Sequence, residues 1–479
     1  MTAFSPHNIA GSATSKKKLI NLLRGWPNHS LLPTQLLDRS AHKVLTNNSV
    51  AFPALEYGPD HGDPRLRRHL ASWLTDFYKP QDQITDDRIA ISGGASQNLA
   101  VLLNVFTDPF YTRRIWIVAP AYHLSFRVIQ DAGFHDKFRA IPEDDEGIDI
   151  DYLRREIKKV ESDAVSQGVV EPKHKPVSRP WAKVYKHVIY AVPTFSNPSS
   201  KTMSLRRREE LLQIAREYDA LIITDDVYDF LQWQAKVASE TEKVAVEQAH
   251  LPRIVDIDRY LDGGAERPGA DGFGNAVSNM SFSKIVSPGL RCGWCEGTPK
   301  FVSGVAEVGS TRSGGNPSQF ASNILAEAME DGELQRRVYE VLQPSYGKRY
   351  RSMIKAINEL LVPLGVGLPQ TDRDIVGGYF IWLTLPDGME GGALVDRARE
   401  DENVAVAHGE LFEVPEDNDQ PKTSFKNDIR VCFAWEDEDA LIEGVKRLAT
   451  VIRTMQSERD ITGSYKIRLQ VEQEAKNLW

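Results

Sequence analysis

Lys284 is the residue with the clearest chemical potential, in the stretch 281–291, S-F-S-K-I-V-S-P-G-L-R. The residues just before this stretch, 277–280, predict the end of a buried strand. A lysine held at a strand end loses hydration, which lowers its pKa and frees the amine as a nucleophile that forms Schiff bases with carbonyl compounds. Ser281, Ser283 and Arg291 would add hydrogen bonds and positive charge for a phosphate. A lone S-x-S-K would instead indicate a surface lysine in a turn.

A pair of glycines stands between a short strand expected at residues 88–92 and an apolar helix, in the segment 93–97, G-G-A-S-Q. A glycine turn that leads into a helix presents free backbone N–H groups and the positive end of the helix dipole to an anion. Ala95 and Ser96 are therefore candidate phosphate-binding residues. A helix start without a ligand has the same pattern.

Two adjacent acids, Asp225 and Asp226, follow the apolar run 220–224, which predicts a buried parallel strand. Ligands bind at the carboxyl ends of strands in open α/β sheets, so this position favours a site, with Tyr228 close behind. The alternatives are a solvated loop or a pair of metal ligands. No histidine lies nearby in the sequence to complete a metal site, and we expect no metal.

The complete string at 281–294, S-F-S-K-x-x-x-P-G-L-R-x-G-W, resembles the lysine motif of the class I/II aminotransferases, which are fold-type I enzymes dependent on pyridoxal phosphate (PLP). The resemblance implies that Lys284 holds PLP as a Schiff base and moves protons during catalysis. It also implies that Asp225 pairs with the protonated pyridine nitrogen, and that Tyr228 binds the phenolic oxygen. The motifs are most similar to the subgroup that acts on 2-aminoadipate, aromatic amino acids and kynurenine.

The same resemblance assigns five further residues. Tyr122, in a P-x-Y segment, matches the aromatic that stacks on the pyridine ring. Asn197, before Pro in the segment 193–198, matches the asparagine that binds the phenolic oxygen beside the substrate. Arg430 matches the arginine that holds the substrate α-carboxylate, and Gly25 lies in a segment that covers the mouth of the site. Tyr57, in Y-G-x-x-x-G-x-x-x-L-R, matches a tyrosine that reaches the PLP phosphate of a partner subunit. An ordinary turn, a structural tyrosine or a rim ion pair could account for each of these alone.

The bulk composition is that of a soluble globular protein of 479 residues, with 41% hydrophobic and 26% charged residues. The net charge of −9 and the lack of a long basic run argue against nucleic acid or an anionic membrane as a partner. No apolar stretch has transmembrane length, and the three cysteines favour a reducing compartment. We expect a cytoplasmic protein. A mitochondrial location stays open because residues 1–37 contain no acid and several Ser and Thr. The C-x-x-C pair at 292–295 is interpreted as a coincidence on a strand.

The alternation of strands and helices predicts an α/β fold, with a large domain built on a mainly parallel sheet and a smaller α+β domain. We expect a flexible lead-in at 1–19, an N-terminal segment at 20–55 that joins the small domain, and a large PLP-binding domain at 56–335. A small C-terminal domain at 336–455 and a polar tail at 456–479 follow. The charged segments 160–183 and 235–275 are interpreted as exposed insertions.

The resemblance implies a homodimeric enzyme that transfers an amino group between an amino acid and a 2-oxo acid, with 2-oxoglutarate as the expected acceptor. Another fold-type I reaction, such as β-elimination or decarboxylation, is an alternative because it uses the same residues. A second alternative is a PLP-sensing regulator. Such a protein needs an N-terminal DNA-binding domain, for which the roughly twenty residues before the first matched segment are too few.

Overall fold

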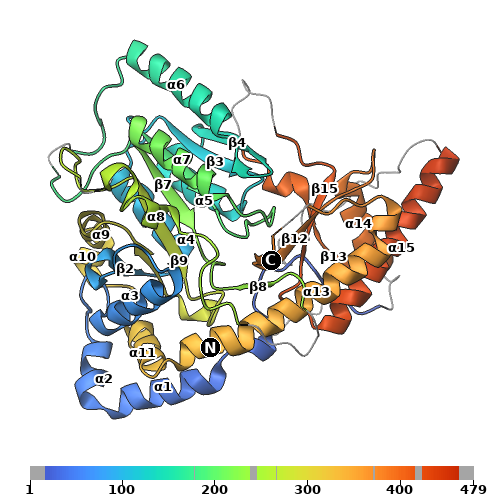
Figure 1. Ribbon diagram of the computed structural model, residues 1–479, viewed down its shortest axis with the longest axis horizontal. Helices are drawn as coiled ribbons and strands as arrows, with labels where there is room; N and C mark the ends of the chain where they lie inside the picture. Colours follow the sequence, from blue (N-terminus) through green and yellow to red (C-terminus); the bar gives the residue numbers. More distant parts are fainter. Residues whose placement is uncertain are drawn as a thin grey trace, which may run out of the picture.

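The computed structural model describes residues 17–176, 179–237, 245–265, 267–369, 373–415 and 423–462, without the side chains of 460–462. Its centre is an eight-stranded sheet in which β9, β7, β6, β3 and β4 are mutually parallel, while β2, β10 and β5 run antiparallel to their neighbours (Figure 1). In spatial order the strands are β2 (Ile89–Ser92), β10 (Gly293–Glu296), β9 (Ala276–Ser281), β7 (Ala220–Asp225), β6 (His187–Ala191), β3 (Arg114–Ala119), β4 (Phe138–Asp144) and β5 (Gly147–Ile148).

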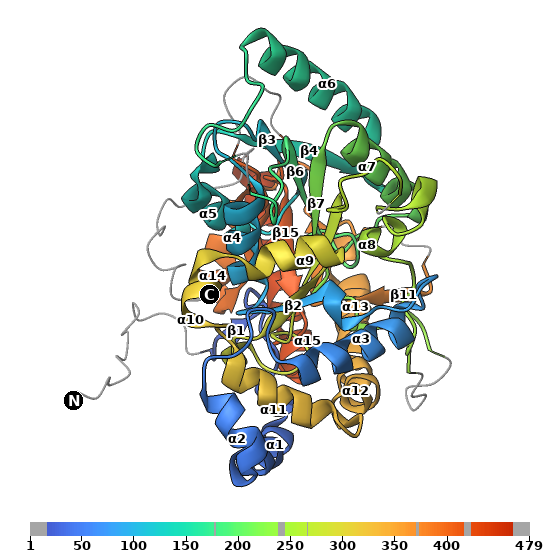
Figure 2. The ribbon, with the colours of Figure 1, turned by 90° about the vertical axis from the view of Figure 1, so that its left-hand side faces the viewer.

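Helices cover both faces of this sheet, as Figure 2 shows. Successive residues of β3 belong to different apolar clusters: Ile115 and Ile117 lie in one, and Trp116 and Val118 in the other. This alternation follows from the two-residue period of a strand, and burial on both faces explains the continuous apolar runs in the sequence. One face packs against α4 (Ala95–Phe106), α5 (Leu124–Ile129) and α9 (Pro299–Ala306), and the other against α6 (Ile150–Ser166), α7 (Leu205–Glu217) and α8 (Ile254–Ile257).

A second, smaller sheet is built from the last third of the chain. It has the antiparallel order β12 (Phe380–Thr384), β15 (Asp428–Cys432) and β14 (Ala407–His408). Two long helices, α13 (Gln343–Leu360) and α15 (Glu438–Thr462), pack beside it together with α14 (Gly391–Glu402). The N-terminal strand β1 (Ile20–Asn21) pairs in parallel with β13 (Val404–Ala405), so residues from both ends of the chain meet here.

The remaining helices form a layer at one side of the large sheet, where α1 and α2 contact α11 (Figure 1). They are α1 (Thr34–Thr46), α2 (Asn48–Leu55), α3 (Pro64–Tyr78), α10 (Gly309–Gly314), α11 (Gln319–Met329) and α12 (Glu333–Arg337). Two short strands, β8 (Gln232–Gln234) and β11 (Ile375–Gly377), pair with each other. Across the described ranges, none of the helices combines the length and the apolar character that a membrane span requires.

The segment 160–183 is not simply an exposed insertion, which corrects the expectation from its charge. Residues 160–166 complete helix α6, and Glu161 contacts the guanidinium of Arg113 at 2.5 Å and the buried His187 ring at 2.9 Å. Farther along, the ammonium of Lys175 donates hydrogen bonds to the carbonyls of Asn104 and Thr107, at the end of α4. The charges in this segment therefore have specific partners on the sheet and on α4.

The segment 235–275 likewise contains a packed part. Residues 238–244 and 266 lie outside the described residues. Helix α8 buries Ile254, Val255 and Ile257 against the large sheet. Arg253, just before α8, is 1% exposed and pairs with Asp256 at 2.8 Å and with Glu296 at 2.7 Å. A buried arginine between two acids is compatible with a charged sequence and an ordered core, which composition alone did not reveal.

The end of the chain differs from the expectation: helix α15 continues to Thr462, past the start of the expected tail at 456, and Glu458 pairs with Arg397 of α14. Strands β11 and β12 are separated at Gly378, whose φ of +79° is in a region that favours glycine. The domain boundaries stay predictions.

Candidate active site

A cavity of about 240 Å³ opens at the carboxyl ends of the parallel strands, between the large sheet and β12 and β15. It brings together every predicted site residue except Tyr57, although these residues are spread from position 25 to position 430 of the chain. Its lining comprises Gly25, Trp26, Pro27, Ala95, Ser96, Tyr122, His123, Leu124, Val192, Asn197, Asp225, Val227, Tyr228, Ser281, Ser283, Lys284, Pro288, Arg291, Phe380 and Arg430. Tyr57 has 88% of its surface exposed and does not line the cavity.

Lys284 follows strand β9, and its amine projects toward the N-terminal segment. Its Nζ donates a 2.6 Å hydrogen bond to the carbonyl of Gly25, and its own carbonyl accepts one of 3.0 Å from the Tyr379 hydroxyl. The rings of Tyr379 and Tyr228 lie 5.2 and 5.9 Å from the amine. Burial lowers the pKa of Lys284 to about 8, so a much larger fraction of the amine is neutral and nucleophilic near neutral pH than in a solvated lysine.

Gly25 is required sterically at this place, because a Cβ there would lie 2.6 Å from the ring of Phe380. The segment after β1 therefore runs tightly along β12 and brings its carbonyl to Lys284.

Asp225 is the last residue of strand β7, and within the described ranges only one of its two carboxylate oxygens accepts a hydrogen bond. Oδ2 accepts a 2.8 Å hydrogen bond from the Tyr190 hydroxyl, whereas Oδ1 is buried without a hydrogen-bond partner in the described part of the chain. Burial raises the pKa of Asp225 to about 6, against the stabilising effects of Tyr190 and Lys284. Asp226 has a different environment, because its Oδ2 accepts hydrogen bonds from the hydroxyls of Thr224 and Ser278. Consecutive strand residues point to opposite faces, which separates the two acids.

An anion cradle forms where the start of α4 meets the turn after Lys284. The first helical residue is Ala95, preceded by Gly94 with a φ of +99°. The guanidinium of Arg291 donates a 2.8 Å hydrogen bond to the Gly93 carbonyl, and a Cβ at Gly94 would lie 2.6 Å from this guanidinium. The hydroxyl of Ser281 donates to that of Ser283 at 2.8 Å. Helix N–H groups, hydroxyls and a guanidinium together are suited to a phosphate.

Arg430 is 2% exposed and lies on β15 of the small sheet. Its Nη1 donates to Asn197 Oδ1 and its Nη2 to the Leu23 carbonyl, both at 2.8 Å. The guanidinium carbon lies 3.8 Å from the ring centroid of Phe380 and 4.8 Å from that of Phe412. A cation fixed between two aromatic rings at a cavity wall can bind a carboxylate with a defined orientation.

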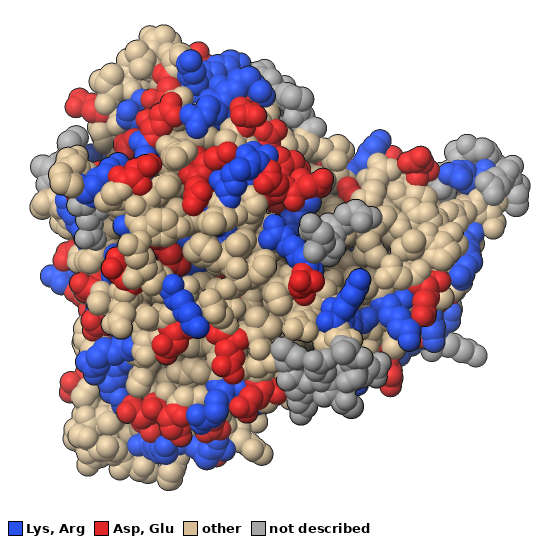
Figure 3. Space-filling model, in the orientation of Figure 1, with Lys and Arg blue, Asp and Glu red and all other residues tan. Residues whose placement is uncertain are grey.

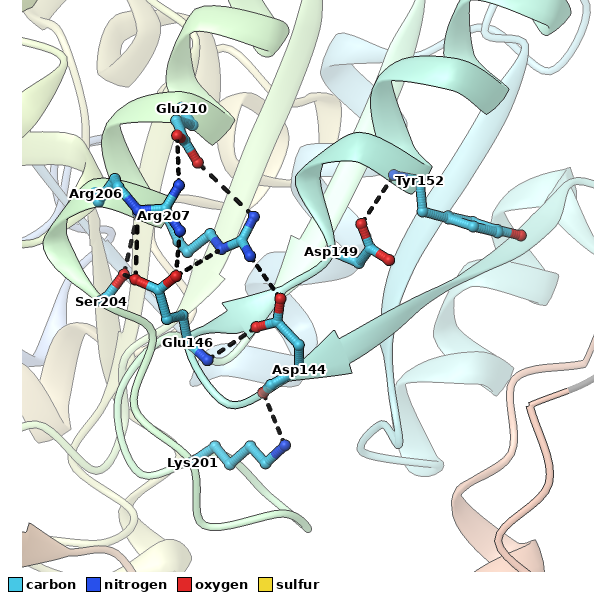
Figure 4. A network of polar contacts seen from close by, with 9 residues as sticks. All are labelled: Asp144, Glu146, Asp149, Tyr152, Lys201, Ser204, Arg206, Arg207 and Glu210. Carbon is cyan, nitrogen blue, oxygen red and sulfur yellow. Dashed lines mark hydrogen bonds and ion pairs between the residues drawn. The ribbon is translucent and has the colours of Figure 1, made fainter. Parts of the chain in front are cut away.

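The loop that carries Asn197 is attached to the hairpin of β4 and β5 by the polar network in Figure 4. Lys201 donates a 2.8 Å hydrogen bond to the carbonyl of Asp144, and Arg207 contacts the carboxylate of Asp144 at 2.5 Å. Ser204, the N-cap of α7, also donates a backbone hydrogen bond to the carbonyl of Glu146. These contacts anchor the loop between Asn197 and α7 to the hairpin.

Sequence reasoning missed several residues of the site. Tyr190 lies in the middle of an apolar strand, and His123 follows Tyr122 without a motif of its own. Burial lowers the pKa of His123 to about 3, so this cavity residue is neutral. An alternation of buried and exposed positions along the strand could have pointed to Tyr190. Both faces of this strand are buried, so the sequence shows no such alternation.

The C-x-x-C pair has the structural character that the sequence suggested. Cys295 is on β10 and Cys292 directly precedes it, and both thiols are free and fully buried. Burial raises the pKa of each thiol to about 12.

The arrangement fits PLP at three points. The buried oxygen Asp225 Oδ1 suits a protonated ring nitrogen, the cradle at Gly94 and Arg291 suits the phosphate, and the amine of Lys284 suits the aldehyde. Tyr122, which lines the same cavity, supplies an aromatic surface.

Comparison with known proteins gives the same result. The pattern of the family described as aminotransferase class I and II matches residues 17–448. A Saccharomyces cerevisiae protein described as uncharacterised is 32% identical over 463 residues, which span 93% of this chain and all of the yeast protein. An aromatic-amino-acid aminotransferase of Thermococcus litoralis is 27% identical over 91% of this chain and 88% of its own length.

Among solved structures, the kynurenine aminotransferase of Pyrococcus horikoshii, in complex with PMP, aligns with a TM-score of 0.69 and 28% identity over 92% of both chains. The fold, the site and these relatives agree: the chain belongs to the class I and II aminotransferases, fold-type I enzymes that transfer amino groups with PLP as the cofactor.

Proposed function

We propose that this enzyme transfers the amino group of an aromatic or 2-aminoadipate-like donor to 2-oxoglutarate, with PLP attached to Lys284. The observation that carries the proposal is the convergence of Lys284, Asp225 and Arg430 on one cavity. These three residues offer an amine for the cofactor aldehyde, a carboxylate for the ring nitrogen and a guanidinium for the substrate α-carboxylate.

When bound, PLP supplies an electron sink for the charge that develops at the substrate Cα. Asp225, through its buried Oδ1, keeps the ring nitrogen protonated. Arg430 would bind the α-carboxylate and orient the Cα–H bond toward Lys284, whose amine, once the substrate amino group has displaced it, would take the proton as a general base. Asn197 and Tyr228 bind the phenolic oxygen of the cofactor. The cradle of Ala95, Ser96, Ser281, Ser283 and Arg291 holds the phosphate.

The mouth of the cavity supports a donor with an aromatic or acidic side chain. Trp26 lines the cavity while 45% of its surface is exposed, and it lies edge-on to Trp435 at 5.9 Å. Arg24 lies over both rings. An indole surface contacts an aromatic side chain well, and a guanidinium that leaves the rings can pair with a distal carboxylate. The aromatic-amino-acid and kynurenine enzymes among the relatives support the same donor class.

We further propose a homodimer in which Tyr57 serves the phosphate site of the partner. Its exposed ring continues an apolar surface on α1, α2 and α11 that comprises Leu45, Phe52, Leu55 and Phe320, each between 40% and 64% exposed. Large exposed apolar side chains in one area are typical of a protein interface. Elsewhere, as Figure 3 shows, acidic and basic side chains are interspersed over most of the visible face.

The three described thiols are all free and buried, which supports a reducing compartment, and we propose a cytoplasmic enzyme of amino-acid biosynthesis.

Borohydride reduction of the holoenzyme, followed by peptide mapping, tests the attachment. The label should lie on the peptide that contains Lys284, and a labelled peptide from another lysine would refute the assignment. A substrate panel then separates the reactions. Keto acid should form only while an acceptor 2-oxo acid is present, whereas β-elimination or decarboxylation would proceed without one. A binding assay with duplex DNA tests the regulator alternative.

A further inference from the structure

Tyr190 is a buried residue whose single polar atom is directed at the cofactor-facing acid. It is 2% exposed, lies on β6, and pairs with Ile117 of β3 and Ile223 of β7 in the large sheet. Its ring belongs to the apolar cluster on the α4 side of the sheet, while its hydroxyl donates a 2.8 Å hydrogen bond to Asp225 Oδ2. Burial, and then the charge of Asp225, raise the pKa of the Tyr190 phenol well above its usual value. The hydroxyl is therefore a permanent donor.

The direction of this hydrogen bond has a consequence for the other carboxylate oxygen. A carboxylate has two oxygens, and fixing one of them fixes the plane of the group. With Oδ2 held by Tyr190, Oδ1 is the oxygen left for the cavity, and it is buried without a hydrogen-bond partner among the described residues. A neutral donor on Oδ2 also stabilises the charged form of the carboxylate.

We propose that Tyr190 is a positioning residue that orients Asp225 and keeps it ionised for the ring nitrogen of PLP. The inference rests on the proposed role of Asp225 and adds a second residue to it. Tyr190 does not line the cavity. Any effect of Tyr190 on PLP binding must therefore act through Asp225. A residue that serves only packing would have an effect that does not depend on Asp225.

Tyr190→Phe is a suitable variant because it removes one oxygen and leaves the shape of the buried ring. Tyr185→Phe is the matched control: Tyr185 is also fully buried, lies two residues before β6, and donates a 2.6 Å hydrogen bond to the Gly274 carbonyl, and neither residue lines the cavity. Both variants lose one buried hydrogen bond, so both apoproteins should melt at similarly lowered temperatures. Only Tyr190→Phe should weaken PLP binding, by about tenfold when free PLP is titrated into apoprotein and followed by absorbance.

The pH dependence of PLP binding gives a readout that packing alone would not move. In the native protein the affinity should fall below about pH 6, as Asp225 takes up a proton. Without the Tyr190 hydroxyl the ionised form loses a donor, so the pKa of Asp225 rises and the loss of affinity should begin at a higher pH. The Tyr185→Phe profile should coincide with the native one.

A double variant separates failure of this inference from failure of the proposed function. In an Asp225→Ala background, Tyr190→Phe should change the PLP affinity by less than about twofold, because no carboxylate is left to orient. An equal loss in both backgrounds, or unchanged affinity and pH profile in Tyr190→Phe alone, would overturn the inference while Asp225 keeps its role. If Asp225→Ala itself binds PLP as tightly as the native protein, the proposed role of Asp225 fails, and this inference fails with it.

Discussion

Arg430 Nη1 donates a 2.8 Å hydrogen bond to Asn197 Oδ1 across a sequence separation of 233 residues. Arg430 belongs to β15 of the small sheet, and Asn197 to the loop that follows β6 of the large sheet. The proposed site for the substrate carboxylate therefore lies where residues of the two sheets meet. A change in the contact between the sheets would alter substrate binding directly.

Replacing Arg430 by Lys should lower kcat/KM for every amino donor by about a hundredfold, mainly through KM, because an ammonium cannot bind a carboxylate at two points. PLP absorbance should be unchanged. Arg397→Lys is the control, since Arg397 is also buried but pairs with Asp401 and Glu458 and does not line the cavity. Steady-state kinetics with two donors checks this, and equal losses in both variants would contradict the role of Arg430.

Asp225→Ala should reduce kcat far more than Asp226→Ala, by several orders of magnitude against about tenfold or less. Only Asp225 offers an oxygen to the cavity, while Asp226 accepts hydrogen bonds from Thr224 and Ser278. Asp226→Ala should instead lower the free energy of unfolding by about 1–3 kcal/mol, because it leaves those hydroxyls without their acceptor. Urea unfolding and single-turnover rates, measured on both variants, test this prediction. A larger catalytic loss at Asp226 would mean that the assignment is off by one residue and that Asp226 serves the cofactor.

The rate at which apoprotein attaches PLP should rise with pH through a midpoint near pH 8 and level off only at higher pH. Only the neutral amine of Lys284 attacks an aldehyde, and its pKa of about 8, lowered by burial, sets the midpoint. The neutral fraction grows as the pH rises through that value, so the rate rises in the same direction. Stopped-flow absorbance between pH 6.5 and 9.5 measures it, with Lys284→Ala as the blank. A midpoint near 10.5, the usual value for lysine, would show that the amine is solvated.

The sequence was sufficient for the fold class and for many of the residues that line the cavity, for a physical reason. Lys284, Asp225 and the glycine turn before Ala95 all follow apolar strands, and parallel strands bring their carboxyl ends to one edge. Chain order therefore already implied proximity. The sequence was insufficient for Tyr190, because the residues of a strand buried on both faces are mainly apolar and do not indicate which face a given residue occupies. It also misjudged the charged segment 160–183, since the partners of Glu161 and Lys175 are distant in sequence.

Mixing two defective subunits should restore activity if Tyr57 serves the neighbouring site. In a hybrid of Tyr57→Phe and Lys284→Ala subunits, the site that keeps Lys284 would receive its tyrosine from the other chain. Refolding the two variants together should give more activity than the sum of either alone, with Tyr57→Phe homodimers showing weakened PLP binding. Sedimentation velocity supplies the control, and a fully active monomer would exclude a shared site.

Arg24 should decide whether the enzyme accepts an acidic donor. Every amino acid has the α-carboxylate that Arg430 binds, so selection must come from the mouth, where Arg24 lies over Trp26 and Trp435. Arg24→Ala should lower kcat/KM for 2-aminoadipate by about tenfold or more, because the distal carboxylate loses its cation, while phenylalanine loses little. Arg39→Ala, which removes a surface ion pair with Glu333, is the matched control. Comparing 2-aminoadipate, phenylalanine, alanine and aspartate on all three proteins tests the donor class. A strong preference of the native enzyme for alanine or aspartate would refute this donor class but not the transaminase activity, because the residues that hold PLP are separate from those at the mouth.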